Sequence, residues 1–97
     1  MVSKISAEKA KIRLAQTKNA VMLDVRTKEE YDEGHVPGSI LIPYDQIAQL
    51  APVLLRDRNA EIYVRCKSGF RSNIACRVLD EIGYTKIYNV TRILDLM

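Results

Sequence analysis

The chain has 97 residues and a formal net charge of +3, with 47% hydrophobic and 28% charged side chains. This size and composition predict a single small domain over residues 1–97, with a modest core and no room for a second domain. The positive excess is not gathered into a basic run interleaved with aromatic residues, which argues against nucleic-acid binding.

Other broad classes are also disfavoured. Charged residues interrupt every apolar stretch near Met1, and no run approaches the ~20 apolar residues of a membrane span. We therefore expect no signal peptide and no membrane contact, with the cytoplasm as the default location. The 2 cysteines lack CxxC spacing and a histidine cluster, which disfavours a disulfide framework and a zinc site. We expect no metal, no cofactor and, by default, a monomer.

The first part of the chain predicts a helix followed by a strand. Ser6 is a candidate N-cap for a helix over residues 7–16, and Ile5 precedes it as a candidate hydrophobic staple. The apolar residues on one face of this helix are Ala7, Ala10 and Leu14. Residues 20–25 then form an apolar run of strand length.

The next segments predict short elements. Thr27 and Glu30 have the Thr-x-x-Glu spacing of a capping box, which predicts a brief helix ending before Gly34. Residues 39–42 form a short apolar strand between two prolines. Asp45 is a candidate cap for a helix that continues through residue 50.

The second half predicts the central strand and the longest helix. The proline at position 52 should end the preceding helix, and residues 61–65 should form the central strand. A helix should begin near Arg71 and end before Gly83 as its C′ residue, and residues 86–90 should form the last strand. The apolar stripe of this helix comprises Ile74, Ala75, Val78, Leu79 and Ile82.

Strands that alternate with helices predict an α/β fold. Its three layers should be a mostly parallel central sheet with helices on both faces, and ligands of such sheets collect at the carboxyl ends of the strands. Cys66 lies at one such end, directly after residues 61–65.

Cys66 has the sequence surroundings of a nucleophile. It lies in a glycine-containing turn between a strand and a helix N-terminus, where backbone N–H groups converge and the helix dipole favours negative charge. Arg65, Lys67 and Arg71 flank it with positive charge. These features predict a thiol pKa below the usual value of about 8.5, and hence a thiolate at neutral pH. The alternative is a small buried apolar residue at a strand end.

Four segments of the chain resemble the rhodanese family. They are the loop Cys-x-x-Gly-x-Arg-Ser at 66–72 and the stretches at 23–31, 33–43 and 83–90, in the order in which the family has them. The resemblance implies a rhodanese-like fold and a sulfurtransferase. In such a protein Cys66 takes a sulfane sulfur from thiosulfate or a persulfide donor, becomes a persulfide, and passes the sulfur to cyanide, a small thiol or a protein thiol.

The rest of the loop supplies the candidate residues that bind the substrate or the persulfide: Lys67, Ser68, Gly69, Phe70 and Arg71. Their N–H groups should cradle an anionic sulfur, Lys67 should attract the donor, and Gly69 should adopt a backbone conformation that side chains disfavour. Arg71 either bonds loop carbonyls, binds the donor's sulfonate end, or is a surface arginine. Phe70 either forms an apolar rim or packs against the helix start.

Four further residues are expected to be structural. His35 falls in a scaffold motif of the family, which favours a hydrogen-bonding role over general-base catalysis. Asp24 ends a strand and either faces the active-site loop or, together with Arg26, pairs with nearby groups to fix turns. Cys76 lies about 7–9 Å of axial rise from the loop, too far for a direct disulfide with Cys66, so it should be a packing residue at the edge of the apolar stripe.

Two alternatives stay open. A non-catalytic module could keep the fold for partner binding, although the presence of Cys66 counts against it. A phosphatase or arsenate reductase is disfavoured by the length of the loop. The loops of those enzymes resemble the pattern Cys-x5-Arg, whereas Cys66 and Arg71 have the shorter spacing Cys-x4-Arg. The chain also departs from the family after residue 90, because the family's Gly-Gly pair is absent, and we expect a shortened C-terminal helix.

Overall fold

A five-stranded parallel sheet forms the centre of the structure, a computed structural model that describes residues 2–65 and 69–91. The strands are β1 (Val2–Ser6), β2 (Val21–Asp24), β3 (Ile40–Leu41), β4 (Glu61–Arg65) and β5 (Lys86–Thr91). Their spatial order is β1-β5-β4-β2-β3, and every neighbouring pair is parallel. The prediction that residues 61–65 form the central strand is therefore confirmed.

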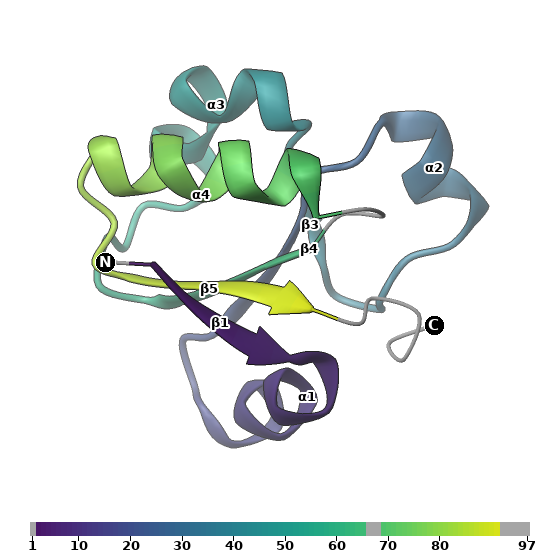
Figure 1. Cartoon of the computed structure of the whole chain (residues 1–97), viewed down its shortest axis with the longest axis vertical. Coiled ribbons are helices and arrows are strands. Elements are labelled where there is room, and N and C mark those ends of the chain that lie inside the picture. The colour runs from purple at the N-terminus through teal and green to yellow at the C-terminus, as the bar shows by residue number, and fades with distance from the viewer. Residues whose placement is uncertain (1, 66–68, 92–97) are drawn as a thin grey trace.

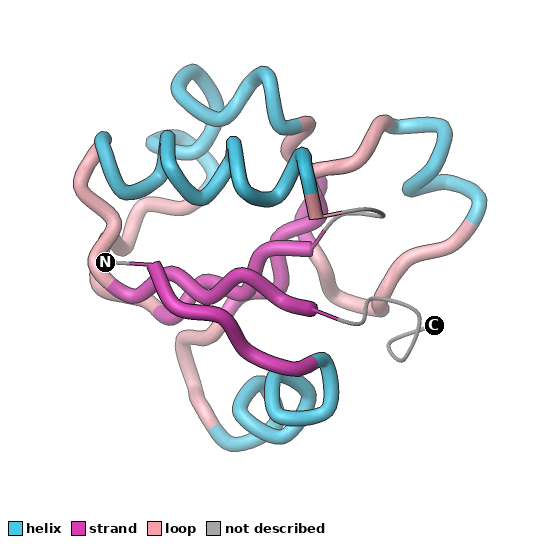
Figure 2. The backbone as a smooth tube through the Cα atoms, in the orientation of Figure 1, coloured by secondary structure: helices cyan, strands magenta, loops and turns pink. Residues whose placement is uncertain are grey.

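Helices cover both faces of this sheet. They are α1 (Ala7–Gln16), α2 (Lys28–Glu33), α3 (Ile47–Leu54) and α4 (Phe70–Glu81), with a 3-10 turn η1 (Tyr44–Gln46) before α3. Figure 1 shows α1 below the sheet, α3 and α4 above it, and α2 to the side toward which the strand arrows point. Figure 2 shows the same three layers as cyan helices around magenta strands, which confirms the predicted α/β class.

Local capping signals in the sequence agree with the structure. The Ser6 side chain accepts a hydrogen bond from the backbone N–H of Lys9, and Thr27 and Glu30 form both bonds of a capping box at the start of α2. Gly83 follows the end of α4 with a φ of +102°, the left-handed conformation expected of a C′ glycine. These predictions hold because the signals are local: each capping bond joins residues only three positions apart, and the conformation of Gly83 belongs to a single residue.

Two predictions for α3 were wrong. Asp45 lies inside the 3-10 turn and does not cap the helix, whose N-cap is Gln46 without a side-chain hydrogen bond. Pro52 lies inside α3, which continues to Leu54. The helix persists because Ile47 and Ala51 are buried in the core, and tertiary packing of one face contributes more to helix stability than local propensity does.

The strand β1 was not anticipated from the sequence. Only two of its five residues are strongly apolar, and three of them are exposed. It forms because its backbone pairs in parallel with β5, from Val2 opposite Ile87 to Ser6 opposite Thr91. Strand β3 is also shorter than the predicted residues 39–42. The predicted shortened C-terminal helix falls on residues 92–97, outside the described residues.

The apolar residues gather in two clusters, one on each face of the sheet. The larger cluster lies between the sheet and the helices α3 and α4, and it includes Leu79 and Cys76, which are 0% and 2% exposed. The smaller cluster lies between the sheet and α1 and includes Ile5 and Tyr63. Cys76 is thus a packing residue, though buried in the core rather than at its edge. In the part of the chain that the structure describes, no helix is long and apolar enough to cross a bilayer.

The burial of α4 predicts the cost of truncating its one leucine, Leu79. Leu79→Ala should lower the free energy of unfolding by about 2–5 kcal/mol, because it leaves a cavity in a fully buried position. Leu54→Ala removes the same atoms from a side chain that is 48% exposed and should have a much smaller effect. Urea denaturation of both variants measures the difference. Equal losses would mean that α4 is not packed as described.

Candidate functional site

The candidate site lies at the carboxyl edge of the sheet, between β4 and α4. Arg65 ends β4, and Gly69 is the N-cap of α4. Cys66, Lys67 and Ser68 lie outside the described residues, so the geometry of the site is known from its two flanks.

The flank next to α4 has the predicted glycine geometry. Gly69 has a φ of +85°, a conformation that L side chains rarely adopt, which confirms the expectation for this position. Its carbonyl accepts hydrogen bonds from the Ser72 hydroxyl and the Asn73 N–H, each at 3.0 Å. The Asn73 side chain in turn accepts a bond from Asn89 of β5 at 2.6 Å. The start of α4 is thereby fixed to the sheet.

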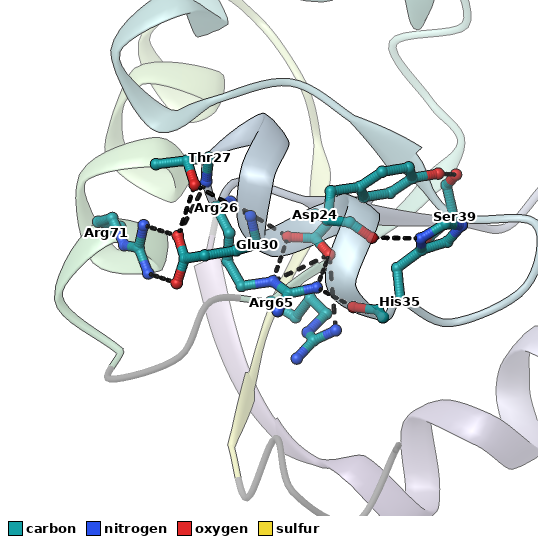
Figure 3. Close-up of polar contacts among 10 residues, drawn as sticks. Asp24, Arg26, Thr27, Glu30, His35, Ser39, Arg65 and Arg71 are labelled. Carbon is teal, nitrogen blue, oxygen red and sulfur yellow. Dashed lines mark hydrogen bonds and ion pairs between the residues drawn. The ribbon is translucent and has the colours of Figure 1, made fainter.

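A buried carboxylate joins the other flank to the end of β2. Asp24 is 0% exposed and accepts three hydrogen bonds from the guanidinium of Arg26. Nε donates to Oδ1 at 2.9 Å and to Oδ2 at 3.1 Å, and Nη2 donates to Oδ2 at 2.8 Å. Arg65, 2% exposed, approaches the same carboxylate with its Nη1 at 3.5 Å from Oδ2. Arg26 also donates to the Gly34 carbonyl at 2.7 Å and so ties the end of α2 to β2 (Figure 3).

A second carboxylate binds the arginine on the helix side of the loop. Both Glu30 oxygens accept bonds from the Arg71 guanidinium, Nη1 to Oε1 at 2.6 Å and Nη2 to Oε2 at 3.0 Å. Thr27 adds its N–H at 3.0 Å and its hydroxyl at 3.1 Å to Oε1 (Figure 3). The bond from Arg71, followed by the bonds from Thr27, lowers the pKa of Glu30 to about 2.

These contacts change the expected electrostatics of the loop. Arg65 and Arg71 were expected to stabilise a thiolate, but Arg71 lies against Glu30, which compensates its charge. Asp24 is shared by Arg26 and Arg65, so this cluster of one carboxylate and two guanidinium groups keeps a net positive charge next to the end of β4. Sequence reasoning assigned Glu30 only to the capping box and did not find its pairing with Arg71. A local motif carries no signal for a partner 41 residues away.

The remaining predicted residues are placed as follows. His35 is exposed, stacks on the Tyr31 ring at 3.6 Å between centroids, and lies with Nδ1 at 2.6 Å from the Tyr31 carbonyl oxygen. These local contacts support the structural role expected for it. Asp24 and Arg26 pair with each other in the β2–α2 connection, and Asp24 also contacts Arg65 at the end of β4. Phe70 is 67% exposed, which fits an apolar rim rather than packing.

The described residues contain no group of three or more metal-ligating side chains arranged to hold an ion. Their ionisable groups instead form the two carboxylate–arginine clusters around Asp24 and Glu30. The arrangement is that of a loop whose flanks are fixed by ion pairs, with a cysteine in the sequence between them.

Fold and site together define an α/β protein with a candidate cysteine loop at the carboxyl edge of a parallel sheet. The family model described as Rhodanese-like domain matches residues 6–92, and the chain belongs to this family. The resemblance inferred from the sequence motifs is therefore confirmed.

Relatives at 34–37% identity include three bacterial proteins. The putative sulfur carrier protein YrkF of Bacillus subtilis is 37% identical over 92% of this chain, which spans only 47% of that protein's length. A sulfurtransferase of Allochromatium vinosum is 34% identical, with 93% of this chain and 82% of that protein covered. Thiosulfate sulfurtransferase PspE of Escherichia coli is 34% identical, with 76% and 71% covered.

Solved structures share the fold. The solution structure of the rhodanese-like domain of the Anabaena protein Alr3790 has a TM-score of 0.86, with 99% of this chain and 73% of that chain covered. Its identity is 24%, so it establishes the fold alone. A structure described as rhodanese with anions from E. coli has a TM-score of 0.69 at 34% identity, with 72% and 82% covered.

The buried Asp24 cluster predicts a large stability loss when its charge is removed. Asp24→Asn should lower the free energy of unfolding by about 3–5 kcal/mol, because it leaves the charges of Arg26 and Arg65 buried without a carboxylate. Asp32→Asn breaks only an exposed pair with Lys28 and should change stability little. Urea denaturation at neutral pH compares them. A stable Asp24→Asn protein would show that the cluster is not structurally required.

The pairing of Glu30 predicts an acid-sensitive contribution to stability. Because the pKa of Glu30 is lowered to about 2, its contribution is present above its unfolded value of about 4.3 and is lost as the pH falls toward 2. Glu30→Gln should therefore destabilise the protein at neutral pH by on the order of 1–3 kcal/mol, with a difference from wild type that shrinks through this window. Urea titrations across it, with the exposed Glu29→Gln as control, measure the effect. A constant difference would contradict it.

Proposed function

We propose that this protein is a sulfurtransferase that carries sulfane sulfur on Cys66. The observation that supports this most is the position of Cys66 in sequence, directly after Arg65 at the carboxyl end of the central strand and before Gly69 at the start of α4. The N-terminus of α4 directly follows the loop, and the dipole and backbone N–H groups of a helix N-terminus favour a nearby anion. A bound sulfur anion needs such donors.

The proposed reaction has two displacement steps. The Cys66 thiolate attacks the sulfane sulfur of a donor such as thiosulfate, a new S–S bond forms, and sulfite leaves with the electron pair of the broken bond. A thiolate or cyanide then attacks the terminal sulfur of the Cys66 persulfide, and Cys66 leaves as the thiolate. No external oxidant, metal or cofactor is needed, because each step transfers a sulfur atom without its bonding electrons.

Two further observations favour sulfur as the atom transferred. The relatives of Allochromatium vinosum and E. coli bear the names sulfurtransferase and thiosulfate sulfurtransferase, which supports the reaction class and thiosulfate as a test donor. The spacing Cys-x4-Arg between Cys66 and Arg71 is one residue shorter than the Cys-x5-Arg of phosphatases and arsenate reductases. A shorter loop leaves less room for a tetrahedral oxyanion.

A mass measurement tests the covalent step. Incubation with thiosulfate should add the mass of one sulfur atom to the wild-type protein, and a reductant should remove it. Cys66→Ser should gain nothing, whereas Cys76→Ala should gain the sulfur like wild type, because Cys76 is buried in the core. Intact-protein mass spectrometry reads all three samples.

Two results would contradict the proposal. Addition of sulfur to Cys66→Ser would place the reactive group elsewhere. A folded wild-type protein that gains no sulfur from thiosulfate or from a persulfide donor would instead favour a non-catalytic module that binds a partner through the same fold.

A further inference from the structure

We infer that Glu30 is a positioning residue for sulfur transfer, because its carboxylate orients Arg71 and thereby fixes the helix side of the Cys66 loop. The inference rests on the proposed sulfurtransferase function. Glu30 lies on α2, outside the loop, and acts through Arg71 rather than on the reacting sulfur.

The contact between the two side chains has the geometry of an orienting bond. Each guanidinium nitrogen Nη1 and Nη2 of Arg71 meets a different oxygen of Glu30, at 2.6 and 3.0 Å. A bidentate pair of this kind fixes the plane of the guanidinium as well as its distance. The side chains of Arg71 and Glu30 are only 19% and 26% exposed, so solvent screens the pair less than it would on an open surface.

Glu30 is itself held in place by the residues around the start and end of α2. The N–H and hydroxyl of Thr27 both donate to the oxygen Oε1 that binds Arg71. The far end of α2 is tied to β2 by the bond from Arg26 to the Gly34 carbonyl. Glu30 is therefore fixed relative to the sheet, which is what a support for a loop requires.

An arginine–carboxylate contact lies on each side of the loop in the sequence. Arg65 precedes Cys66 and lies against Asp24, while Arg71 follows the loop and lies against Glu30. Both carboxylates come from residues 24–30, the end of β2 and the start of α2. One short segment of the chain thus contacts both flanks of the candidate nucleophile. Because small misplacements of reacting groups can cost about 100-fold in rate, these contacts should affect catalysis.

A charge effect and a positioning effect of Glu30 have opposite signs. Removal of a carboxylate makes the surroundings of Cys66 more positive, so charge alone predicts faster capture of an anion such as thiosulfate. Loss of the support for Arg71 instead disorganises the loop and predicts slower capture. The direction of the change therefore separates positioning from charge, provided that the variant is folded under the assay conditions.

The experiment measures thiosulfate:cyanide sulfur transfer in four variants. Glu30→Gln retains the oxygen that accepts from Thr27 but loses the ion pair, and Arg71→Lys retains the charge but loses the bidentate fork. Each should lower kcat/KM for thiosulfate roughly 10- to 100-fold in a folded protein. The kcat/KM of the double variant should be no lower than that of the worse single variant, because both changes break the same contact between Glu30 and Arg71. Glu29→Gln, an exposed neighbour on α2, should match wild type.

A second measurement does not depend on sulfur transfer. Alkylation of Cys66 by the anion iodoacetate relative to neutral iodoacetamide should decrease severalfold in Glu30→Gln, against the direction of the charge change. If wild type transfers no sulfur, the proposed function fails, and this ratio still decides whether Glu30 positions the loop. An unchanged or increased ratio and kcat/KM in folded Glu30→Gln would overturn the inference. Multiplicative losses in the double variant would also overturn it, because Arg71 would then act without Glu30.

Discussion

The buried carboxylate of Asp24 is the constraint on which the site depends. A buried charge must be paired, and Asp24 is 0% exposed. It is paired with Arg26, two residues further along the chain, and is contacted by Arg65 from the neighbouring strand β4. The contact with Arg65 joins the carboxyl ends of β2 and β4. Arg26 extends the network to the Gly34 carbonyl and so positions α2. This network therefore links the end of β4 to the chain segment that carries Glu30.

The same pairing shapes the electrostatics proposed for Cys66. Arg65 and Arg71 stand closest to the cysteine in sequence among the described cations. Glu30 compensates the charge of Arg71, whereas Asp24 is shared by Arg26 and Arg65. We therefore expect Arg65 rather than Arg71 to add positive potential near Cys66, beside the N-terminus of α4, where the helix dipole also favours negative charge.

Much of the fold could be predicted because its signals are local or periodic. Ser6, Thr27 and Gly83 mark helix ends through bonds within one turn, and the apolar stripe of α4 identifies the face that lies on the sheet. The failures have a common origin. The helix through Pro52 and the strand β1 form because of partners distant in sequence, the core around Ile47 in one case and the backbone of β5 in the other.

The sequence by itself determined the family, the α/β architecture and the position of Cys66 between the central strand and a helix, because these follow from motif order, periodicity and turn chemistry. Only the tertiary structure decided how the loop flanks are fixed. The contacts of Arg65 with Asp24 and of Arg71 with Glu30 each span 41 residues. Such pairings depend on which strand ends and helices the parallel sheet brings together, and no local pattern around Glu30 or Arg71 encodes that neighbourhood.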